Sequence, residues 1–404
     1  MEANYKINTI PSLTWNWLKM NNDTVELNPE EFTVCENEIP VSSTGMTTSS
    51  TGMTDTGASI TDTGTGMTMT SAGTTMTEEL SLSGLNRQSF GSGIFNIANK
   101  KMPDSRVESE SAEQTEKTSV IHPLQKAFDE RKSETIKITG KKADSIIINL
   151  TAKGKTYSSQ TIIAEKDSEA TVIFIYSDDA QNNEAAQIIR TKVLAKEGSS
   201  IHVVKVQLLG SNTEQLDDTA FIAEENAKLQ FTQIELGGKH IASGLHVNLN
   251  GYKSSFKSNV AYICKENQLL DMNHIVYHFG KKSECDMHVN GTLEGSAKKT
   301  YRGTIDFKNG CCGSKGNEME EVLLLSPLAL NNSLPVILCD EEDVEGEHGS
   351  TIGRISQDIL FYMQTRGISQ KEAEKLLSKA KIQAAADFIP DEEIKQKIRD
   401  WLGD

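Results

Sequence analysis

The chain has 404 residues and a formal net charge of −16, and it lacks an apolar run of the roughly 18–20 residues that a membrane-spanning helix needs. The acidic balance argues against nucleic-acid binding, which needs a basic patch to displace counterions from phosphates. The length exceeds what one hydrophobic core requires, so we expect two or three structural parts.

Residues 1–41 are predicted to form an N-terminal arm. The start, MEANYKINTIPSL, contains neither the basic nor the apolar stretch of a secretory signal, which favours a cytoplasmic protein. Trp15 and Trp17 lie in an apolar patch, and we expect them to anchor the arm on the main body. The alternative, a stacking platform for bases, would need basic neighbours, which are sparse here.

Residues 42–118 are predicted to be a low-complexity insertion without a fixed structure. From Ser42 to Thr77 the sequence is rich in Ser, Thr, Gly and Met, has no aromatic residue, and carries only two charges, Asp55 and Asp62. Such a segment cannot bury enough apolar surface to offset the entropy lost on ordering. The sequence assigns no role to it.

The main body is predicted to consist of many short strands. From Glu134 to Phe307, β-branched runs recur at nearly even spacing, separated by glycines or small polar residues. Apolar residues alternate in places, for example from Thr232 to Leu236, as in strands with one solvated face. The strand pattern predicts a mainly β architecture but leaves a sandwich, a barrel and a β-solenoid open.

Residues 351–404 are predicted to form a small helical domain. Ser356 is suited to cap a first helix that ends at Gly367, and Ser369 with Glu372 forms a capping box for a second. Acidic residues from Asp391 onward begin a third helix. An apolar stripe on these helices either binds a partner or packs against the β body.

Side chains that bind metals or handle protons are concentrated between Pro335 and Ile368. Cys339 is followed by a run of carboxylates and by His348. If residues 344–348 are extended, Glu345 and Glu347 share one face and His348 lies on the other. The alternative interpretation is a solvated acidic loop with a hydrogen-bonding histidine.

The six cysteines lack a CxxC spacing, so we expect reduced thiols rather than a zinc finger or a thioredoxin-type centre. Cys311 and Cys312, flanked by Gly310 and Gly313, are predicted to lie in a turn. There, both thiols would be accessible to iron, persulfide or a soft metal, unless they are incidental small residues. Motifs of nucleophilic or nucleotide chemistry, such as GxSxG, Walker A and HExxH, are absent from the sequence, which indicates a protein that is not an enzyme.

Three stretches occur in a characteristic order: LHVNLNG, TYRGTIDFKNG, and EVLLLSPLALNNSLPVILCDEEDVEGEHGSTIGRISQDILFYMQTRGIS. Together they resemble the SufB/SufD family of iron–sulphur cluster assembly scaffolds. The resemblance implies a right-handed parallel β-helix over residues 119–350, with the N-terminal arm and the C-terminal α-helical domain on either side. It also implies pairing with a SufB-like subunit, docking of the ABC-type ATPase SufC, and transfer of a transiently held iron–sulphur cluster to acceptor proteins.

Within this family the chain resembles SufD more than SufB. His348 matches the SufD histidine where SufB has glutamate, and the SufB sulphur-accepting cysteine would fall near Glu320, where this chain has none. The resemblance implies His348 as a cluster residue at the interface with the partner, and we expect Cys339 and Glu347 to aid it there. The implied ATPase-binding residues lie on the C-terminal helices: Ile359, Phe361, Tyr362, Arg366, Leu376 and Leu377.

Two rival functions remain open at this point. In the first, the chain pairs with a second copy of itself and accepts sulphur on its own cysteines, so that Cys311, Cys312 and Cys339 would be essential. In the second, it is a β-helical enzyme acting on polysaccharides, which would need an aromatic-lined groove with paired carboxylates and an export signal. The sequence does not show either feature, and it does not specify the cluster type.

Overall fold

The computed structural model describes residues 3–10, 20, 22–35, 48–50, 133–179 and 184–403. Trp15, Trp17 and all of residues 42–118 except 48–50 lie outside the described residues, so the predictions made for them stay predictions. In the described part, no helix is both long and apolar enough to cross a membrane.

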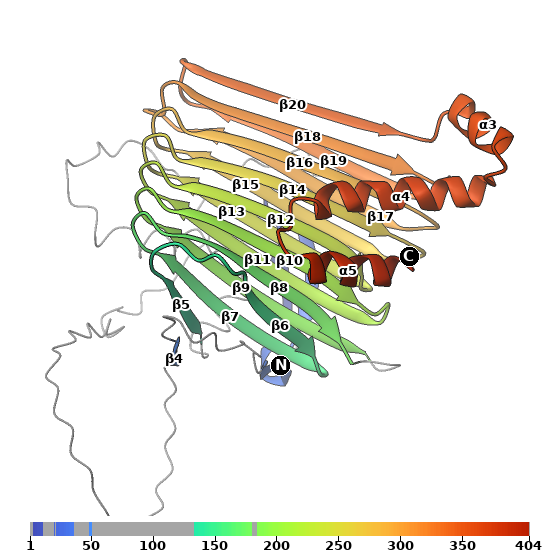
Figure 1. The fold of residues 1–404 in the computed structure, drawn as a ribbon, viewed down its shortest axis with the longest axis horizontal. Helices are drawn as coiled ribbons and strands as arrows, with labels where there is room; N and C mark the ends of the chain where they lie inside the picture. The colour runs from blue at the N-terminus through green and yellow to red at the C-terminus, as the bar shows by residue number, and fades with distance from the viewer. Residues whose placement is uncertain are drawn as a thin grey trace, which may run out of the picture. The chain divides into compact units, whose positions relative to one another are not determined.

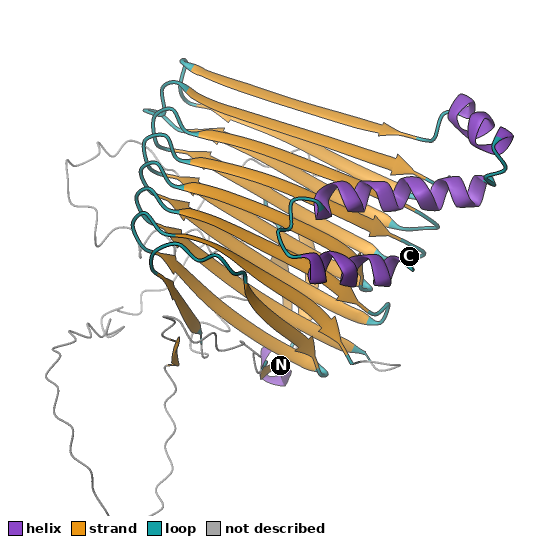
Figure 2. Ribbon diagram, viewed as in Figure 1, coloured by secondary structure: helices purple, strands orange, loops and turns teal. Residues whose placement is uncertain are grey.

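Two parallel sheets dominate the structure, and consecutive strands alternate between them (Figures 1 and 2). The even-numbered sheet contains β6 (Ile146–Ala152), β8 (Glu169–Asp178), β10 (Ser200–Leu209), β12 (Lys228–Gly237), β14 (Ser255–Cys264), β16 (Glu284–Leu293), β18 (Ser314–Leu324) and β20 (Val344–Gly353). The odd-numbered sheet contains β5 (Glu134–Ile138), β7 (Lys155–Ala164), β9 (Ala185–Ala195), β11 (Thr213–Ala223), β13 (His240–Leu249), β15 (Leu269–His278), β17 (Lys298–Phe307) and β19 (Leu330–Cys339). A short strand, β4 (Thr48–Ser50), pairs antiparallel with β5 at the edge of this sheet.

Because each strand pairs in parallel with the strand two places along the chain, the backbone winds as a β-solenoid. The predicted mainly β fold with a parallel β-helical core is therefore confirmed. Residues that face each other on successive turns are about thirty apart in sequence, as in the hydrogen bonds that span 27 and 31 residues. Each turn of the solenoid therefore takes about thirty residues and adds one strand to each of the two sheets.

The corners between the sheets are tight turns that use the left-handed backbone region. Asp167, Asn226 and Lys253 have φ near +55° in equivalent corners, each leading from the odd-numbered to the even-numbered sheet. At Gly237 the need for glycine is absolute, because a Cβ there would lie 1.9 Å from the carbonyl oxygen of Leu209 on the preceding turn. Glycines such as Gly198, Gly251 and Gly310 lie where the chain turns, whereas Gly291 lies within β16.

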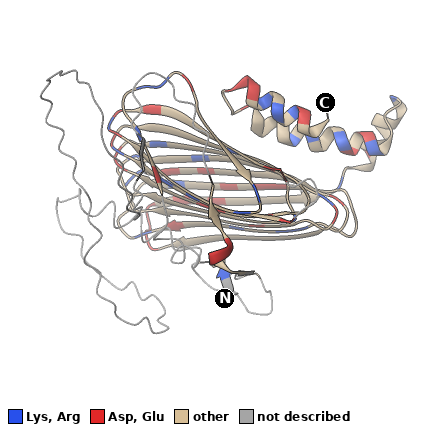
Figure 3. Ribbon diagram, turned by 90° about the horizontal axis from the view of Figure 1, so that it is seen from below, with Lys and Arg blue, Asp and Glu red and all other residues tan. Residues whose placement is uncertain are grey.

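Every second residue of each strand faces the interior, which is filled mainly by stacked aliphatic and aromatic side chains such as Phe221, Phe231 and Phe256. Charged residues nevertheless occur within the strands as well as in the turns (Figure 3). A middle cluster consists of Lys205, Asp217 and Glu235, all buried. The Lys205 Nζ donates to Asp217 Oδ1 at 2.5 Å, joining the two sheets through the interior.

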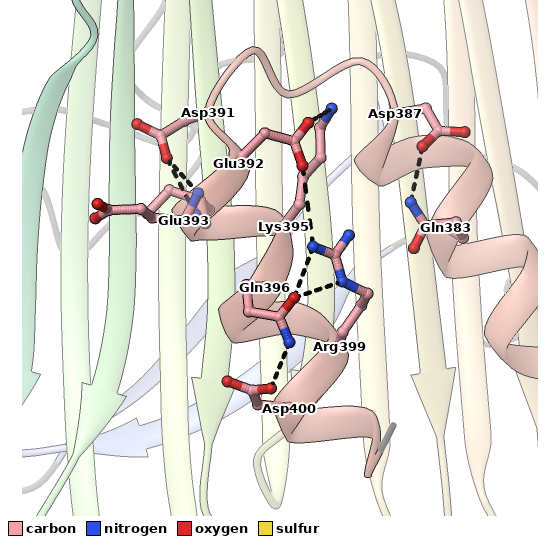
Figure 4. A network of polar contacts seen from close by, with 10 residues as sticks. Gln383, Asp387, Asp391, Glu392, Glu393, Lys395, Gln396, Arg399 and Asp400 are labelled. Atoms are coloured by element: carbon pink, nitrogen blue, oxygen red, sulfur yellow. Dashed lines mark hydrogen bonds and ion pairs between the residues drawn. The ribbon is translucent and has the colours of Figure 1, made fainter.

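Three helices follow the last strand, α3 (Gln357–Thr365), α4 (Gln370–Ala386) and α5 (Glu392–Leu402), and their predicted starts are confirmed. Ser356 caps α3, and Ser369 with Glu372 forms the capping box of α4. Asp391 caps α5, whose outer side carries the bonds Glu392–Lys395 and Gln396–Asp400 (Figure 4). Buried apolar residues of α4, α5 and their connection pack on the outer face of the even-numbered sheet: Ile382, Ala385, Ala386, Ile389, Ile394 and Ile398.

The N-terminal segment covers part of the outer face of the odd-numbered sheet. Strands β1 (Ala3–Ile7) and β2 (Asp23–Leu27) form an antiparallel pair, a 3-10 helix follows at Pro29–Glu31, and β3 (Thr33–Val34) pairs with β7. Ile7 and Phe32 pack against Tyr157, Ile188 and Leu216 of the sheet. The predicted arm is thus anchored on the body by these described residues.

Candidate functional site

The candidate cluster residues lie on the last turn of the solenoid. Strands β19 and β20 are the terminal strands of their sheets, so in the part of the chain that the structure describes each is hydrogen-bonded to a strand on one side only (Figure 1). Their free edges carry unpaired backbone donors and acceptors, which can pair with another chain. Glu347 and His348 lie on β20, and Cys339 ends β19.

His348 lies on the inward-facing side of β20. The neighbouring inward residue Ser350 donates its hydroxyl to Glu320 Oε2 at 3.0 Å, and a Cβ at Gly346 would meet the core residue Phe307 at 3.0 Å. Since His348 occupies the position between them in the period-two pattern, it shares their face. It is exposed, because no further turn lies on top of it in the described chain.

Glu345 and Glu347 lie on the opposite, outward side of β20, as the alternation predicted. Glu345 forms an ion pair with Lys315 at 2.8 Å. The structure therefore does not bring Glu347 to the same side as His348. Among the described residues no group of three or more His, Cys, Asp or Glu side chains is arranged to hold a metal ion.

The thiols near this end differ in environment. Cys339 is exposed, and its Sγ donates to the carbonyl oxygen of Glu341 at 3.0 Å. Cys312 is exposed and donates to Asp343 Oδ2 at 2.7 Å, a hydrogen bond that raises the pKa of the Cys312 thiol. Cys311 is buried in the solenoid core. The predicted turn is confirmed, but the expectation that both adjacent thiols are accessible is wrong for Cys311.

A set of buried polar residues, the end cluster, lies directly beneath the last turn and was not anticipated from the sequence. It consists of Lys299 on β17 and of Glu318 and Glu320 on β18. Lys299 pairs with Glu320 and also donates to Asn331 Oδ1 at 2.9 Å on β19. Alternating charges such as Glu318 and Glu320 are visible in the sequence, but the pattern alone does not tell which face is inside.

Glu318 has an unusual environment within the end cluster. Its side chain is buried, and burial raises the pKa of its carboxyl to about 7. The carboxyl reaches across the interior to Gly303 on β17, where an added Cβ would lie 1.9 Å from Glu318 Oε1. Glycine at position 303 therefore provides the space that this carboxyl occupies.

The surroundings of His274 and His278 in β15 indicate structural roles. His274 and His278 are buried, and burial lowers the pKa of each to about 3. The His278 ring bonds Ser283 Oγ at 2.7 Å and stacks on Phe307. Neither is available to a partner, in contrast to His348.

The residues expected to bind the ATPase are mostly exposed. On α3, Ile359, Phe361 and Tyr362 have exposed fractions of 50%, 69% and 60%, large values for apolar side chains. Arg366 follows them and lies over the Tyr362 ring. On α4, Leu376 is exposed and Leu377 is half-buried.

Comparison with known proteins bears directly on this arrangement of solenoid and helices. The family described as SUF system FeS cluster assembly, SufBD core domain, matches residues 147–381, which include the strands from β8 to β20 and helix α3. The chain belongs to this SufBD family. The resemblance found in the sequence is therefore confirmed.

Individual members of the SufBD family are similar to more than half of the chain. It is 24% identical over 238 residues to the iron–sulfur cluster assembly protein SufD of Bacillus subtilis, covering 59% of this chain and 54% of that protein. It is 23% identical over 239 residues to SufD of Escherichia coli, covering 58% and 55%. A SufBD family protein of Trieres chinensis is 23% identical over 233 residues, covering 56% and 48%. The chain spans about half the length of these curated relatives, and it is a SufD-like member of the family.

Proposed function

We propose that the chain is a non-enzymatic scaffold subunit that pairs with a SufB-like subunit through its last solenoid turn. The iron–sulphur cluster, as cargo, is held transiently at that interface and passed to acceptor proteins. The observation that carries the proposal is His348, an exposed imidazole between the two open sheet edges of a SufD-like solenoid. An imidazole nitrogen is a suitable ligand for iron.

The partner is needed because the last turn supplies too few ligands by itself. The described residues contain no group of three side chains able to hold a metal, whereas an iron–sulphur cluster requires several. A partner seated on the β19 and β20 edges would complete the set around His348. Cys339, exposed at the end of β19, and Glu347, on the outward side of β20, are secondary candidates in this proposal.

We further propose that α3 and the adjoining part of α4 dock SufC. The exposed residues Ile359, Phe361 and Tyr362 form an apolar patch that needs a partner to be buried, and Arg366, Leu376 and Leu377 extend the surface. Helices α4 and α5 are fixed on the solenoid through Ile382 and Ile394, so force from a moving ATPase would reach the sheets. Six free cysteines support a reducing compartment such as the cytoplasm.

Co-purification with the SufB-like and SufC subunits tests the pairing and the cluster site. We expect His348→Ala to retain both partners but to lose most of the iron and acid-labile sulphide of the complex. His288→Ala is the matched control, because His288 is a part-exposed histidine on β16 that bonds Asp286 on the outer face. Equal cluster content in the His348→Ala and wild-type complexes would refute the site, and loss of every partner by the wild type would refute the scaffold.

Two further variants separate this proposal from self-pairing. Replacing Phe361 and Tyr362 by serine should release SufC but keep the SufB-like subunit. Replacing Cys312, the exposed thiol near the end of the solenoid that is not among the proposed cluster residues, by serine should leave cluster content close to wild type. If the cysteine variant abolishes the cluster, and the chain elutes as a homodimer, the self-pairing scaffold is the correct function.

A further inference from the structure

The residue in register with His348 on the neighbouring strand is Glu318. Strands β18 and β20 are parallel, so the two side chains leave the sheet on the same inward face, one turn apart. Beneath them in the same column lies Met287 of β16, which offers no strong hydrogen-bonding group. The carboxyl of Glu318 is therefore the polar group that lies next to the imidazole along the strand stack.

The Glu318 carboxyl has spare hydrogen-bonding capacity. Its Oε2 is buried and has no hydrogen-bond partner among the described residues. The neighbouring carboxyl of Glu320 is different, because Lys299 and Ser350 both donate to it. The Tyr301 hydroxyl also lies near Glu318, but a carboxylate has lone pairs for more than one donor.

The His348 imidazole is the complementary group. Among the described residues, the ring of His348 has no hydrogen-bond partner. A ring nitrogen that binds a metal is commonly oriented by a carboxylate that accepts the N–H of the other ring nitrogen. The geometry of β18 and β20 supplies both halves of that arrangement.

We propose that Glu318 is a positioning residue for His348: its Oε2 accepts a hydrogen bond from one ring N–H of His348 and thereby fixes the tautomer and the direction of the other ring nitrogen. The use of this contact in cluster binding rests on the proposed function, whereas the contact itself does not. Gly303 supports it independently, because a side chain on β17 would push the Glu318 carboxyl out of its place beneath the last turn.

The test is the tautomer of His348 in the full chain. Protein labelled with ¹⁵N at histidine gives two-bond proton–nitrogen correlations that distinguish the two neutral tautomers, and His348→Gln identifies the signal among the eight histidines. At about pH 8 a free imidazole is neutral. We expect wild-type His348 to show one dominant tautomer, and Glu318→Met, which keeps the side-chain length but removes the acceptor, to change the tautomer ratio roughly tenfold.

Glu318→Gln should give an intermediate tautomer ratio, because its amide oxygen still accepts a hydrogen bond. This variant also keeps the test possible if Glu318→Met does not fold. Glu320→Gln is the matched control, because Glu320 is an equally buried carboxyl on the same face of β18 that stands in register with Ser350 instead. Identical His348 spectra in wild type and both Glu318 variants would overturn the proposal. So would an equally large change in Glu320→Gln.

The consequence for the assembled complex is measured separately. Glu318→Met should lower the iron content of the co-purified complex about tenfold or more, as loss of an outer-shell partner does at metal sites. If His348→Ala leaves the cluster intact, the proposed function fails while the tautomer result still stands. If His348→Ala removes the cluster but Glu318→Met leaves tautomer and iron unchanged, the positioning role fails alone.

Discussion

The middle cluster and the end cluster are built from the same parts in different surroundings. Each contains one buried lysine, Lys205 or Lys299, that pairs across the interior with a carboxylate, Asp217 or Glu320. Each also contains a second buried carboxyl, Glu235 or Glu318, whose pKa is raised by burial. The middle cluster has several turns on both sides, whereas the end cluster has only the last turn above it.

The difference between the clusters contrasts a structural role with the positioning role that we propose for Glu318. Buried ion pairs cost desolvation, and breaking the pair in the enclosed middle cluster would leave a buried charge without its partner. In the end cluster, a buried lysine and two buried carboxyls lie one turn from the exposed edge, and Glu318 is in register with His348.

The largest expected effect is the loss of a buried lysine in the middle cluster. Lys205→Met would leave Asp217 and Glu235 buried without a positive charge, and we expect the free energy of unfolding to fall by about 3–5 kcal/mol. Lys299→Met should cost less, because Glu320 keeps a hydrogen bond from Ser350 and lies closer to solvent. Urea unfolding of the two variants compares them. A larger loss for Lys299→Met would contradict the contrast.

The next effect is a dependence of stability on pH through Glu235. Burial, and then the charge of Asp217, raise the pKa of Glu235 from 4.5 to about 8. Between these values the folded state keeps a proton that the unfolded state has lost, so stability falls as pH rises from about 5 to 8. Glu235→Gln should remove this decline and stabilise the protein at pH 8 by on the order of a few kcal/mol. Melting temperatures that run parallel in both proteins across this range would exclude it.

A smaller effect is expected at Gly303 in the end cluster. Gly303→Ala places a Cβ 1.9 Å from Glu318 Oε1, and the displaced carboxyl should cost about 1–3 kcal/mol of stability. Gly353→Ala on β20 is the control, since a Cβ there meets nothing within 4 Å. Thermal unfolding measures both. If the two substitutions cost the same, Gly303 does not serve to accommodate Glu318.

The smallest effect is expected on the outer face of the solenoid. Lys315 pairs with Glu345 on the outward side of β20, where both side chains are more than half exposed. Solvent and salt screen such pairs, so Lys315→Ala should unfold within error of the wild type. A clear loss of stability by differential scanning calorimetry would show that the outward side of the last turn is also structurally important.

The strands could be predicted from the sequence, but their arrangement could not. The alternation from Thr232 to Leu236 identifies a strand with two different faces, yet it fits a sandwich equally well, because it does not show that β12 pairs with β10 and β14. The stacking joins residues about thirty positions apart and leaves no strict repeat in the side chains. The choice of a solenoid came from the family resemblance, not from the strand pattern.

The candidate site was predictable to a similar extent. Period-two geometry correctly placed Glu345 and His348 on opposite faces of one strand. It did not reveal Glu318 and Lys299, because inward and outward charges look alike in a sequence until the opposite sheet is known. For Cys311 and Cys312, adjacency suggested a shared site, but neighbours in the chain were separated by the turn, with one side chain in the core and the other outside.

The attachment of the N-terminal segment also constrains the order in which the protein can assemble on the ribosome. Asn8 Nδ2 donates to Asp271 Oδ1 at 2.6 Å, across 263 residues, and Arg302 donates to the carbonyl oxygen of Met20. Asn8 and Met20 therefore cannot make these contacts until β15 and β17 have been synthesised. Early turns can stack as they emerge, as in other repeat folds, while their outer face is still uncovered. Until the segment docks, the apolar residues Tyr157, Ile188 and Leu216 on this face lack its cover.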